Sequence, residues 1–448
     1  MIVLSRQQIS SEWIKASRSN YLSDMLDIID VGATANQQTS GSASAYRRES
    51  IVSRFSYSYN DKYLLEFNSR YDGSDLFAKG KRFGFFPALS AGWVLTKEAF
   101  MSNIKFLNNF KIRGSYGELG NDNIGQYQYM SFYSFGSGAA IGMPPSTFQN
   151  NIYLSRLANA DVTWERSKKT DFGFEALLLK NITLEFDLFW ENRDNILGKR
   201  GATIPSYYGI SDGQMPFENF QKIDNKGFEF TSGYNKQFSN GLSLQARFNV
   251  TSTQNKIIYI GEATDLPARM KQEGRPLNSM FGLISLGLFQ SEQEIIDAYG
   301  VDYMNERGIK PGDIHFEDLN GDKKIDENDR TYIGNNNVPK VMYGFNSVLS
   351  FKGFELSMFF QGASGNEAFF STYMAQPFAA GGKALKAHTD YWRPDNTGAK
   401  YPRITLSSNW NYGEDPNTFW KYNMSYLRLK NMEFGYSLPK QFVNKLSI

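Results

Sequence analysis

The sequence predicts an all-β protein, an antiparallel transmembrane β-barrel, on three observations. Polar and apolar residues alternate along many segments, as in strands with one face toward lipid and the other toward a polar lumen. The connections between these segments are alternately short and long, like the periplasmic turns and extracellular loops of outer-membrane barrels. Aromatic residues make up 15% of the chain although its mean hydropathy is -0.46. Two aromatic belts around a polar lumen would explain that combination.

The expected strands follow one another as hairpins from Arg47 to Leu438. Between residues 182 and 190 every second side chain is apolar, and the side chains between them are polar except Phe189. The strand before it, which contains Phe172 and Phe174, is separated from it by Lys180-Asn181, a spacing typical of a hairpin. Three further hairpin turns are expected, at Asn60-Asp61, Ser239-Asn240-Gly241 and Lys352-Gly353.

The other connections are long and polar, and they are expected to be extracellular loops: residues 73–82, 119–165, 196–221, 257–338 and 364–424. Loops of this length are uncommon in a compact soluble domain. Between them we count about eleven spanning strands, each near or above the ~9–11 residues that a tilted strand needs to cross a bilayer. Single-chain bacterial barrels close with an even number of strands, so an odd number predicts a partial barrel.

The start of the chain lacks a secretory leader. Met1-Ile2-Val3-Leu4 is followed at once by polar residues, without a basic segment or a longer apolar core. Because an outer-membrane protein must be exported, we expect its natural start to lie upstream. Residues 1–46, rich in Ser, Gln and Ala, are then expected to be the remnant of an extracellular loop, and residues 47–448 to form the barrel wall.

Several other classes of protein are disfavoured. No apolar run reaches the ~18 residues of a membrane-spanning helix, and a net charge of +2 without cysteine favours neither a nucleic-acid partner nor a disulfide framework. His315 and His388 are the only histidines, and phosphate-loop, nucleophile-elbow and dinucleotide motifs are absent. No enzyme activity is expected. Glu185, Asp187 and Glu229 would suit a glycosidase pair, but their alternating positions favour the lumen wall.

An acidic segment carries the sharpest local signal. Oxygen-bearing side chains occupy positions 1, 3, 5, 9 and 12 of an EF-hand-like loop, and a backbone carbonyl is available at position 7. The six residues are Asp318, Asn320, Asp322, Lys324, Asp326 and Asp329. Position 6 is Lys323 instead of the usual Gly, and an Asp replaces the bidentate Glu at position 12. The segment is a candidate calcium loop that would brace an external loop, and the alternative is a solvated acidic loop stiffened by side-chain turns.

Aromatic residues in the long loops are the remaining candidates for ligand contact, since flat rings with polar tips suit sugar rings and peptide side chains. The alternatives are that these residues pack within their own loops or contact a partner protein. They are Tyr207, Tyr208, Phe217, Trp392, Trp410, Tyr412 and Trp420.

An ordered set of phrases carries a resemblance to a known family. They are residues 54–63 (RFSYSYNDKY), 79–93 (KGKRFGFFPALSAGW), 110–117 (FKIRGSYG) with Gly120-Asn121, Trp164-Glu165 before 171–174 (DFGF), 311–314 (PGDI) with 318–322 (DLNGD), and 426–431 (YLRLKN). In this order they resemble the C-terminal barrel part of SusC/RagA-type TonB-dependent outer-membrane transporters, from Arg47 to the end of the chain.

The resemblance implies a fragment of a larger transporter. Family members also have a signal peptide, a TonB box, a plug domain and further C-terminal strands, so this chain would be about half of a wall of 22 strands. It implies import of glycans or oligopeptides across the outer membrane, driven by the TonB complex. A SusD-like surface lipoprotein would cover the mouth at loops 257–338 and 364–424. The alternative is a non-transporting adhesin or propeller, although no repeat of about 40 to 50 residues supports a propeller.

Overall fold

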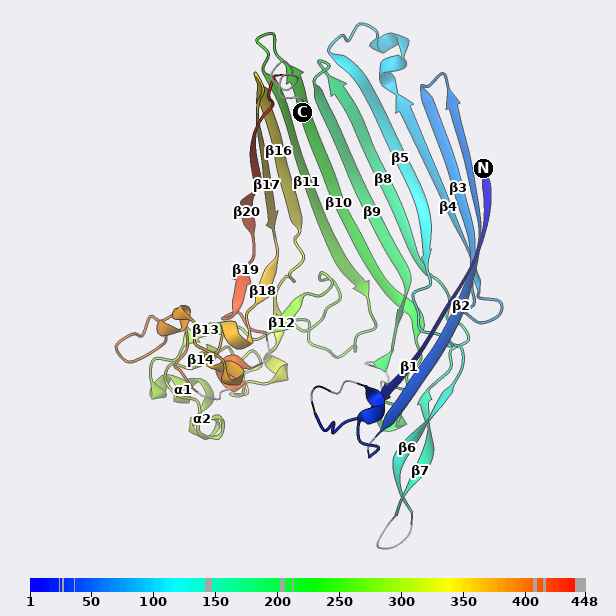
Figure 1. Ribbon diagram of the computed structural model, residues 1–448. Coiled ribbons are helices and arrows are strands. Elements are labelled where there is room, and N and C mark those ends of the chain that lie inside the picture. Colours follow the sequence, from blue (N-terminus) through cyan, green and yellow to red (C-terminus); the bar gives the residue numbers. More distant parts are fainter. Residues whose placement is uncertain are drawn as a thin grey trace. The chain divides into compact units, whose positions relative to one another are not determined.

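The computed structural model describes residues 1–23, 25, 28–35, 37–141, 147–201, 206–211, 213–405, 409–413 and 416–439. Its main element is an antiparallel sheet of twelve strands in the order β1-β2-β3-β4-β5-β8-β9-β10-β11-β16-β17-β20 (Figure 1). Every neighbouring pair in this order is also consecutive among the strands of the sheet, so the topology is up-and-down. The sheet is not closed, because β1 and β20 are its two edges.

The twelve strands are long. They are β1 (Ile2–Ser17), β2 (Gln38–Tyr59), β3 (Tyr63–Ser74), β4 (Phe83–Val94), β5 (Leu107–Asn121), β8 (Glu165–Leu178), β9 (Ile182–Gly198), β10 (Glu218–Gln237), β11 (Ser243–Tyr259), β16 (Val341–Phe351), β17 (Phe354–Ser364) and β20 (Tyr426–Tyr436). The four expected hairpins are present. Their turns contain residues with positive φ, among them Asn60, Asp61, Lys180, Gly241 and Lys352, as such tight turns require.

The structure changes one expectation about the N-terminal region. Residues 1–46 are not only a loop remnant, because β1 pairs with β2 along its whole length, from Ile2 opposite Ser53 to Ser17 opposite Gln38. The sheet therefore has twelve strands instead of about eleven, and the argument for a partial barrel from an odd number loses its premise. The sequence pattern did not reveal β1, because Ser and Gln occupy both of its faces and apolar residues do not alternate along it. Backbone hydrogen bonds to β2 hold this strand in the sheet.

The remaining elements are short. The strands are β6 (Phe132–Ile141), β7 (Thr147–Arg156), β12 (Met280–Gly282), β13 (Ser285–Leu288), β14 (Ile314–Phe316), β15 (Thr331–Gly334), β18 (Glu367–Phe369) and β19 (Lys421–Asn423), and the α-helices are α1 (Glu292–Tyr299), α2 (Val301–Arg307) and α3 (Asn409–Tyr412). Single 3-10 turns occur at Ile29–Val31, Leu95–Lys97, Ala99–Met101, Ser206–Tyr208, Glu327–Asp329, Thr372–Met374, Ala379–Gly381 and Lys386–Thr389. Within the described residues, no helix has the length and apolar character that a membrane crossing requires.

The chain divides into two compact units. The first comprises residues 1–93, 114–170 and 192–222. Its strands β2, β3 and β4 place Phe55, Phe67 and Leu89 directly opposite one another on an exposed apolar face. The other face is polar, and there Arg54 pairs with Glu66. At the long-loop end of these strands, a small core gathers Phe77, Phe86, Val162 and Trp164.

The second unit comprises residues 94–113, 171–191 and 223–448 and shows the same two faces. On one face, the rings of Phe110, Phe174, Phe186 and Phe228 form a continuous row across four strands, with successive centroids 5.9, 5.8 and 6.3 Å apart. On the polar face, Asp187 accepts a hydrogen bond of 2.7 Å from Arg113. Arg113 also lies 3.2 Å from Glu175. Aromatic pairs and charge pairs thus alternate across the same strands.

Candidate functional site in the long loops

The two longest connections of the second unit fold together at the loop end of its strands. We call this part the loop subdomain, residues 280–334 and 367–423; it contains α1, α2 and the short strands β12 to β15, β18 and β19 (Figure 1). Side chains of its core are fully buried: Phe289 is 0% and Trp420 1% exposed. The backbones of Leu283 and Thr418 are joined by a hydrogen bond of 3.0 Å. The two loops therefore form one packed body with a shared core.

A buried carboxylate joins the two loops. Asp313, 1% exposed, lies in the first loop, and Arg403 and Asn411 lie in the second. Arg403 Nη2 donates to Asp313 Oδ2 at 3.0 Å, and its Nε lies 2.7 Å from Oδ1. Asn411 donates to Asp313 Oδ1 at 2.7 Å and accepts from the Ile314 backbone N–H at 2.9 Å. Pairing and hydrogen bonding together satisfy a charge that would be costly to bury alone.

Four of the seven loop aromatics pack inside the loop subdomain, which was one of the alternatives. Trp420 donates to the Asn411 carbonyl at 2.8 Å, and Trp410 donates to the Ile314 carbonyl at 2.7 Å. Trp392 is buried and donates to Gln290 at 3.0 Å. Tyr412 packs against the core, and burial raises the pKa of its hydroxyl. These rings stabilise the loop subdomain; Trp392 and Trp420 are buried, and Trp410 and Tyr412 are partly buried.

The other three aromatics lie in the first unit. Tyr207 and Tyr208 are 82% and 64% exposed, and their rings stack with centroids 5.1 Å apart. Phe217 is partly buried, with Lys199 Nζ 5.3 Å from its ring centroid. The tyrosine pair therefore remains the best placed of the seven for ligand contact, because two adjacent open rings offer a stacking platform.

The acidic segment forms a closely wound loop. Asp318 accepts backbone hydrogen bonds from Gly321 at 2.6 Å and Lys323 at 2.7 Å. Asn320 accepts from Asp322, and Asp322 accepts from Lys324, each at 2.9 Å. Lys323, at the position where EF-hands have Gly, has φ of 63°. Such side-chain turns are expected of the alternative interpretation, an acidic loop that its own side chains stiffen.

The last two carboxylates of this segment cap its end. Asp329 is fully buried and accepts from the backbone N–H groups of Leu319 at 2.8 Å and Asp326 at 2.9 Å. Asp326 in turn accepts from the Asn328 N–H at 2.7 Å. Among the described residues, no cluster of three or more His, Cys, Asp or Glu side chains has the geometry to hold a metal ion. Calcium binding by this loop stays a prediction.

The buried hydroxyls and histidines of the loop subdomain are structural. The Tyr299 hydroxyl donates to the Phe316 carbonyl at 2.5 Å, and burial raises its pKa. Tyr303 donates to the Ile325 carbonyl at 2.9 Å and so fastens the acidic loop to α2. The imidazole of His315 stacks on the Phe289 ring at 4.2 Å, and its pKa is lowered chiefly by burial. His388 is buried against Tyr401.

Sequence reasoning missed two features of the loops. The first is the contact of Asp313 with Arg403 and Asn411, for which the only signal was the phrase at residues 311–314. The second is the hairpin of β6 and β7, which presents Tyr133, Phe135 and Ile152 to solvent. Neither feature places apolar residues at the regular spacing that marks a strand or a helix in a sequence.

The comparisons with known proteins agree with this architecture. A family model described as TonB dependent receptor-like, beta-barrel, matches residues 6–448. The chain belongs to the TonB-dependent receptor β-barrel family. Barrels of this family lie in the outer membrane, so the aromatic face of the sheet meets lipid and the charged face lines the lumen. Glu185 and Asp187 are accordingly residues of the wall.

Two curated relatives match this TonB-dependent receptor barrel over most of its length. TonB-dependent receptor P3 of Formosa agariphila is 27% identical over 458 residues, which cover 99% of this chain and 44% of that protein. SusC of Bacteroides thetaiotaomicron is 26% identical over 410 residues, or 87% of this chain and 38% of SusC. The barrel therefore spans less than half the length of these relatives. They are receptors and not enzymes, as expected.

Among solved structures, the barrel is similar to the RagAB peptide importer in its open-open state. The TM-score is 0.76 at 19% identity, and the match covers 99% of this chain and 46% of that chain. At this identity the likeness is one of fold. The resemblance to SusC/RagA-type TonB-dependent transporters and the outer-membrane location are confirmed.

Proposed function

We propose that this barrel is the wall of a TonB-dependent importer that takes up oligomeric nutrients, glycans or oligopeptides, through the outer membrane. The observation that carries the proposal is the loop subdomain, because a packed core holds two long loops in a fixed form at the loop end of the strands. A rigid surface of this kind suits recognition better than free loops do, since little conformational entropy is lost on binding.

A surface lipoprotein of the SusD type is the proposed partner at this surface. The exposed side chains of the loop subdomain include Leu286, Tyr373 and Phe378, and apolar side chains of this kind can seat a partner protein. Its buried aromatics hold the surface in place from within. Energy for uptake is proposed to come from the TonB complex, which would act on a plug domain. The matched region is 44% of TonB-dependent receptor P3, so that relative is long enough to contain a plug domain as well.

Co-purification tests the partner. The protein is expressed in its native outer membrane with a tag on a SusD-like lipoprotein encoded beside it, and the membrane is solubilised in mild detergent. Recovery of the barrel with the lipoprotein supports the proposal. Arg403→Leu, which breaks the buried ion pair, should reduce the recovery, whereas Arg393→Leu, at an exposed pair with Asp395, should not. Equal recovery of barrel with and without the tagged lipoprotein would contradict the partnership.

Uptake distinguishes the two substrate classes. Cells with and without the intact gene are given fluorescent oligosaccharides or fluorescent oligopeptides of matched size. Gene-dependent uptake of one class identifies the substrate, and a Tyr207→Ala, Tyr208→Ala double variant should reduce that uptake several-fold if the exposed ring pair contacts it. No gene-dependent uptake of either class would contradict the importer.

A further inference from the structure

A polar pocket opens in the first unit, where the chain enters β8 and β10. Its volume is about 390 Å³, within the range of roughly 300–1,000 Å³ for sites that bind small ligands. One wall comes from residues 158–161, before β8, and the other from residues 216–219, at the start of β10. The lining residues are Ala158, Asn159, Asp161, Pro216, Glu218 and Asn219. The pocket therefore lies at the loop end of the strands, where an imported ligand would first meet the wall.

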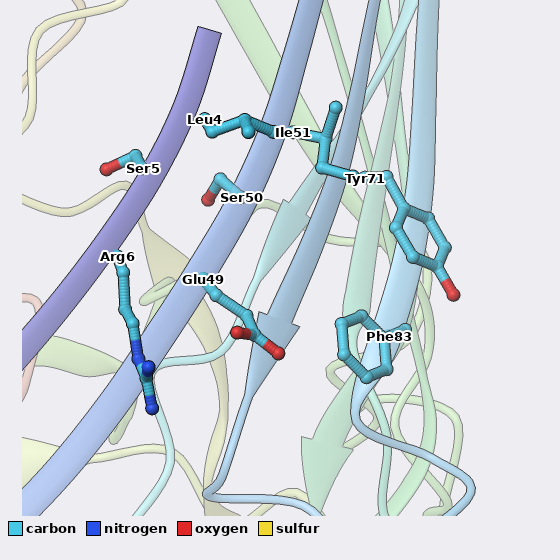
Figure 2. Close-up of a pocket in the computed structure, with 8 residues that line it drawn as sticks. All are labelled: Leu4, Ser5, Arg6, Glu49, Ser50, Ile51, Tyr71 and Phe83. Atoms are coloured by element: carbon cyan, nitrogen blue, oxygen red, sulfur yellow. The ribbon is translucent and has the colours of Figure 1, made fainter.

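Another pocket, of about 420 Å³, differs from it in character. It lies across strands β1 to β4, and Figure 2 shows the side chains that line it. Leu4, Ile51 and Tyr71 are directly opposite one another there. Because side chains alternate along a strand, Ile51 and Tyr71 share the exposed apolar face of Phe55 and Phe67. That face meets lipid, so the polar pocket at β8 and β10 is the better candidate for a water-soluble ligand.

Side-chain hydrogen bonds fix the two walls of the polar pocket to each other. Asn219 Nδ2 donates to the Thr163 carbonyl at 2.9 Å, and Asn219 Oδ1 accepts from the Thr163 N–H at 2.9 Å. Asn159 Nδ2 donates to the Phe217 carbonyl at 2.7 Å. Asn159 Oδ1 accepts from the Asp161 N–H at 3.0 Å. The segment before β8 is thus bound to the start of β10, and walls held in this way need little ordering when a ligand binds.

Each of the two carboxylates in the lining is paired with a basic residue. Glu218 Oε2 accepts from Arg200 Nε at 2.7 Å, and Asp161 Oδ1 lies 3.3 Å from Lys81 Nζ. The Arg200 guanidinium also lies over the Phe220 ring, 4.2 Å from its centroid. The two basic residues balance the two carboxylates, so the pocket has little net charge with which to attract an ion of either sign.

The lining keeps hydrogen-bonding capacity for a ligand. A carboxylate accepts at both of its oxygens, so Glu218 and Asp161 can accept further hydrogen bonds beside their ion pairs. The Asn159 amide has two N–H donors, and its bond to the opposite wall uses one of them. Ala158 and Pro216 add small apolar surfaces. This combination matches a neutral molecule with many hydroxyls, since each hydroxyl both donates and accepts.

We propose that this pocket binds one neutral sugar unit of an imported oligosaccharide. Asp161 and Glu218 would accept hydrogen bonds from the sugar hydroxyls, and Asn159 would donate to one of them. The inference rests on the proposed import function and, of its two substrate classes, selects glycans. An oligopeptide fits less well, because extended peptides are typically bound along a strand edge, whereas the polar groups of this pocket belong to side chains.

Saturation-transfer NMR tests the inference on the protein, extracted from its outer membrane in a sugar-free mild detergent. The probes are neutral hexasaccharides of glucose, mannose, galactose or xylose, and oligopeptides of matched size. At least one hexasaccharide should bind, and the oligopeptides should not. Asp161→Ala and Glu218→Gln should each weaken that binding about tenfold, the loss of one hydrogen bond to a charged group. Asp395→Ala is the matched control, since it also removes an exposed carboxylate paired with a basic residue, and it should bind like the wild type.

Two results would overturn the inference: no hexasaccharide binds the wild type, or the Asp161→Ala, Glu218→Gln double variant binds as tightly as Asp395→Ala. Heat-modified mobility on gels checks that each variant is folded. Uptake by cells separates this inference from the proposed function. Gene-dependent uptake that the double variant leaves unchanged would retain the importer and reject the pocket. Absence of any gene-dependent uptake would reject the importer itself.

Discussion

Asp313 and Arg403, 90 residues apart in the sequence, form an ion pair with a separation of 2.7 Å in the interior of the loop subdomain. Each belongs to a different long loop, so the pair fixes one loop against the other. Asn411 and the Lys310 backbone N–H complete the coordination of the carboxylate. The form of this extracellular surface therefore depends on a polar contact as well as on its apolar core.

Arg403→Leu should destabilise the loop subdomain by about 3–5 kcal/mol, because it leaves the Asp313 carboxylate buried without a counter-charge. Hydrogen exchange of the segments 283–325 and 401–420 measures the effect, and faster exchange is expected there with the strands of the sheet unchanged. Arg393→Leu provides the control, since its partner Asp395 is exposed. Unchanged exchange in Arg403→Leu would show that the apolar core alone holds the loops.

Phe186→Arg should destabilise the membrane-inserted sheet by about 2–4 kcal/mol, the cost of a basic side chain on the lipid face near the membrane midplane. Phe186 lies in the aromatic row between Phe174 and Phe228. Glu185→Arg, one residue earlier and on the lumen face, should cost far less. The unfolding free energy in lipid vesicles compares the two variants, and equal costs would contradict the assignment of faces.

The loop subdomain should lose stability in acid through His315. Its pKa is lowered from the ordinary value of 6.5 by burial, which outweighs the opposing effect of Glu294. The pKa of His315 is lower in the folded state than in the unfolded state. The contribution of neutral His315 to the stability of the loop subdomain is therefore complete above pH 6.5 and is lost as the pH falls through the folded-state pKa. Hydrogen exchange at pH 7.5 and pH 5 should show this loss in the wild type. His315→Phe keeps a ring stacked on Phe289 and should lose less stability between pH 7.5 and pH 5 than the wild type does. If the variant loses as much as the wild type, the pH dependence comes from groups other than His315.

If the acidic loop binds calcium, the dissociation constant should be on the order of 10⁻⁴–10⁻³ M, the range of extracellular modules. Its backbone hydrogen bonds already hold Asp318, Asn320 and Asp322 in a wound loop. Terbium luminescence, displaced by calcium, measures binding. Asp322→Ala should abolish it, and Asp302→Ala on α2 should leave it intact. Failure of the wild type to bind either ion would leave the loop as one stiffened by its own side-chain turns.

Much of the sheet could be predicted from sequence because two local signals coincide there. Alternation with a period of two marked strands such as Ile182–Gly198, and residues tolerant of positive φ marked turns such as Asn60-Asp61. The signal fails where a strand is polar on both faces, as in β1. The existence of such a strand depends on its partner, and a single segment does not reveal its partner.

The loop subdomain could not be predicted in the same way. Its core joins Phe289 and Trp420 from separate loops, and contacts of that sequence separation leave no local pattern. Trp392, Trp410 and Trp420 were candidates for ligand contact because loops usually lie at the surface. Here the loops are long enough to build their own core, so Trp392 and Trp420 are buried and Trp410 is partly buried. Aromatic content alone does not separate a binding surface from a small core.

The alternation of lipid and lumen faces along the strands is the central claim, and cysteine labelling tests it most directly. The chain has no cysteine, so a single introduced cysteine is the only site in this chain that a maleimide can label. We choose Phe67→Cys on the apolar face of β3 and Asn68→Cys on its polar face. In intact outer membranes a hydrophilic maleimide should label Asn68→Cys and spare Phe67→Cys, while a lipid-borne maleimide should do the reverse. Equal labelling of both positions by the hydrophilic reagent would contradict a sheet that faces lipid.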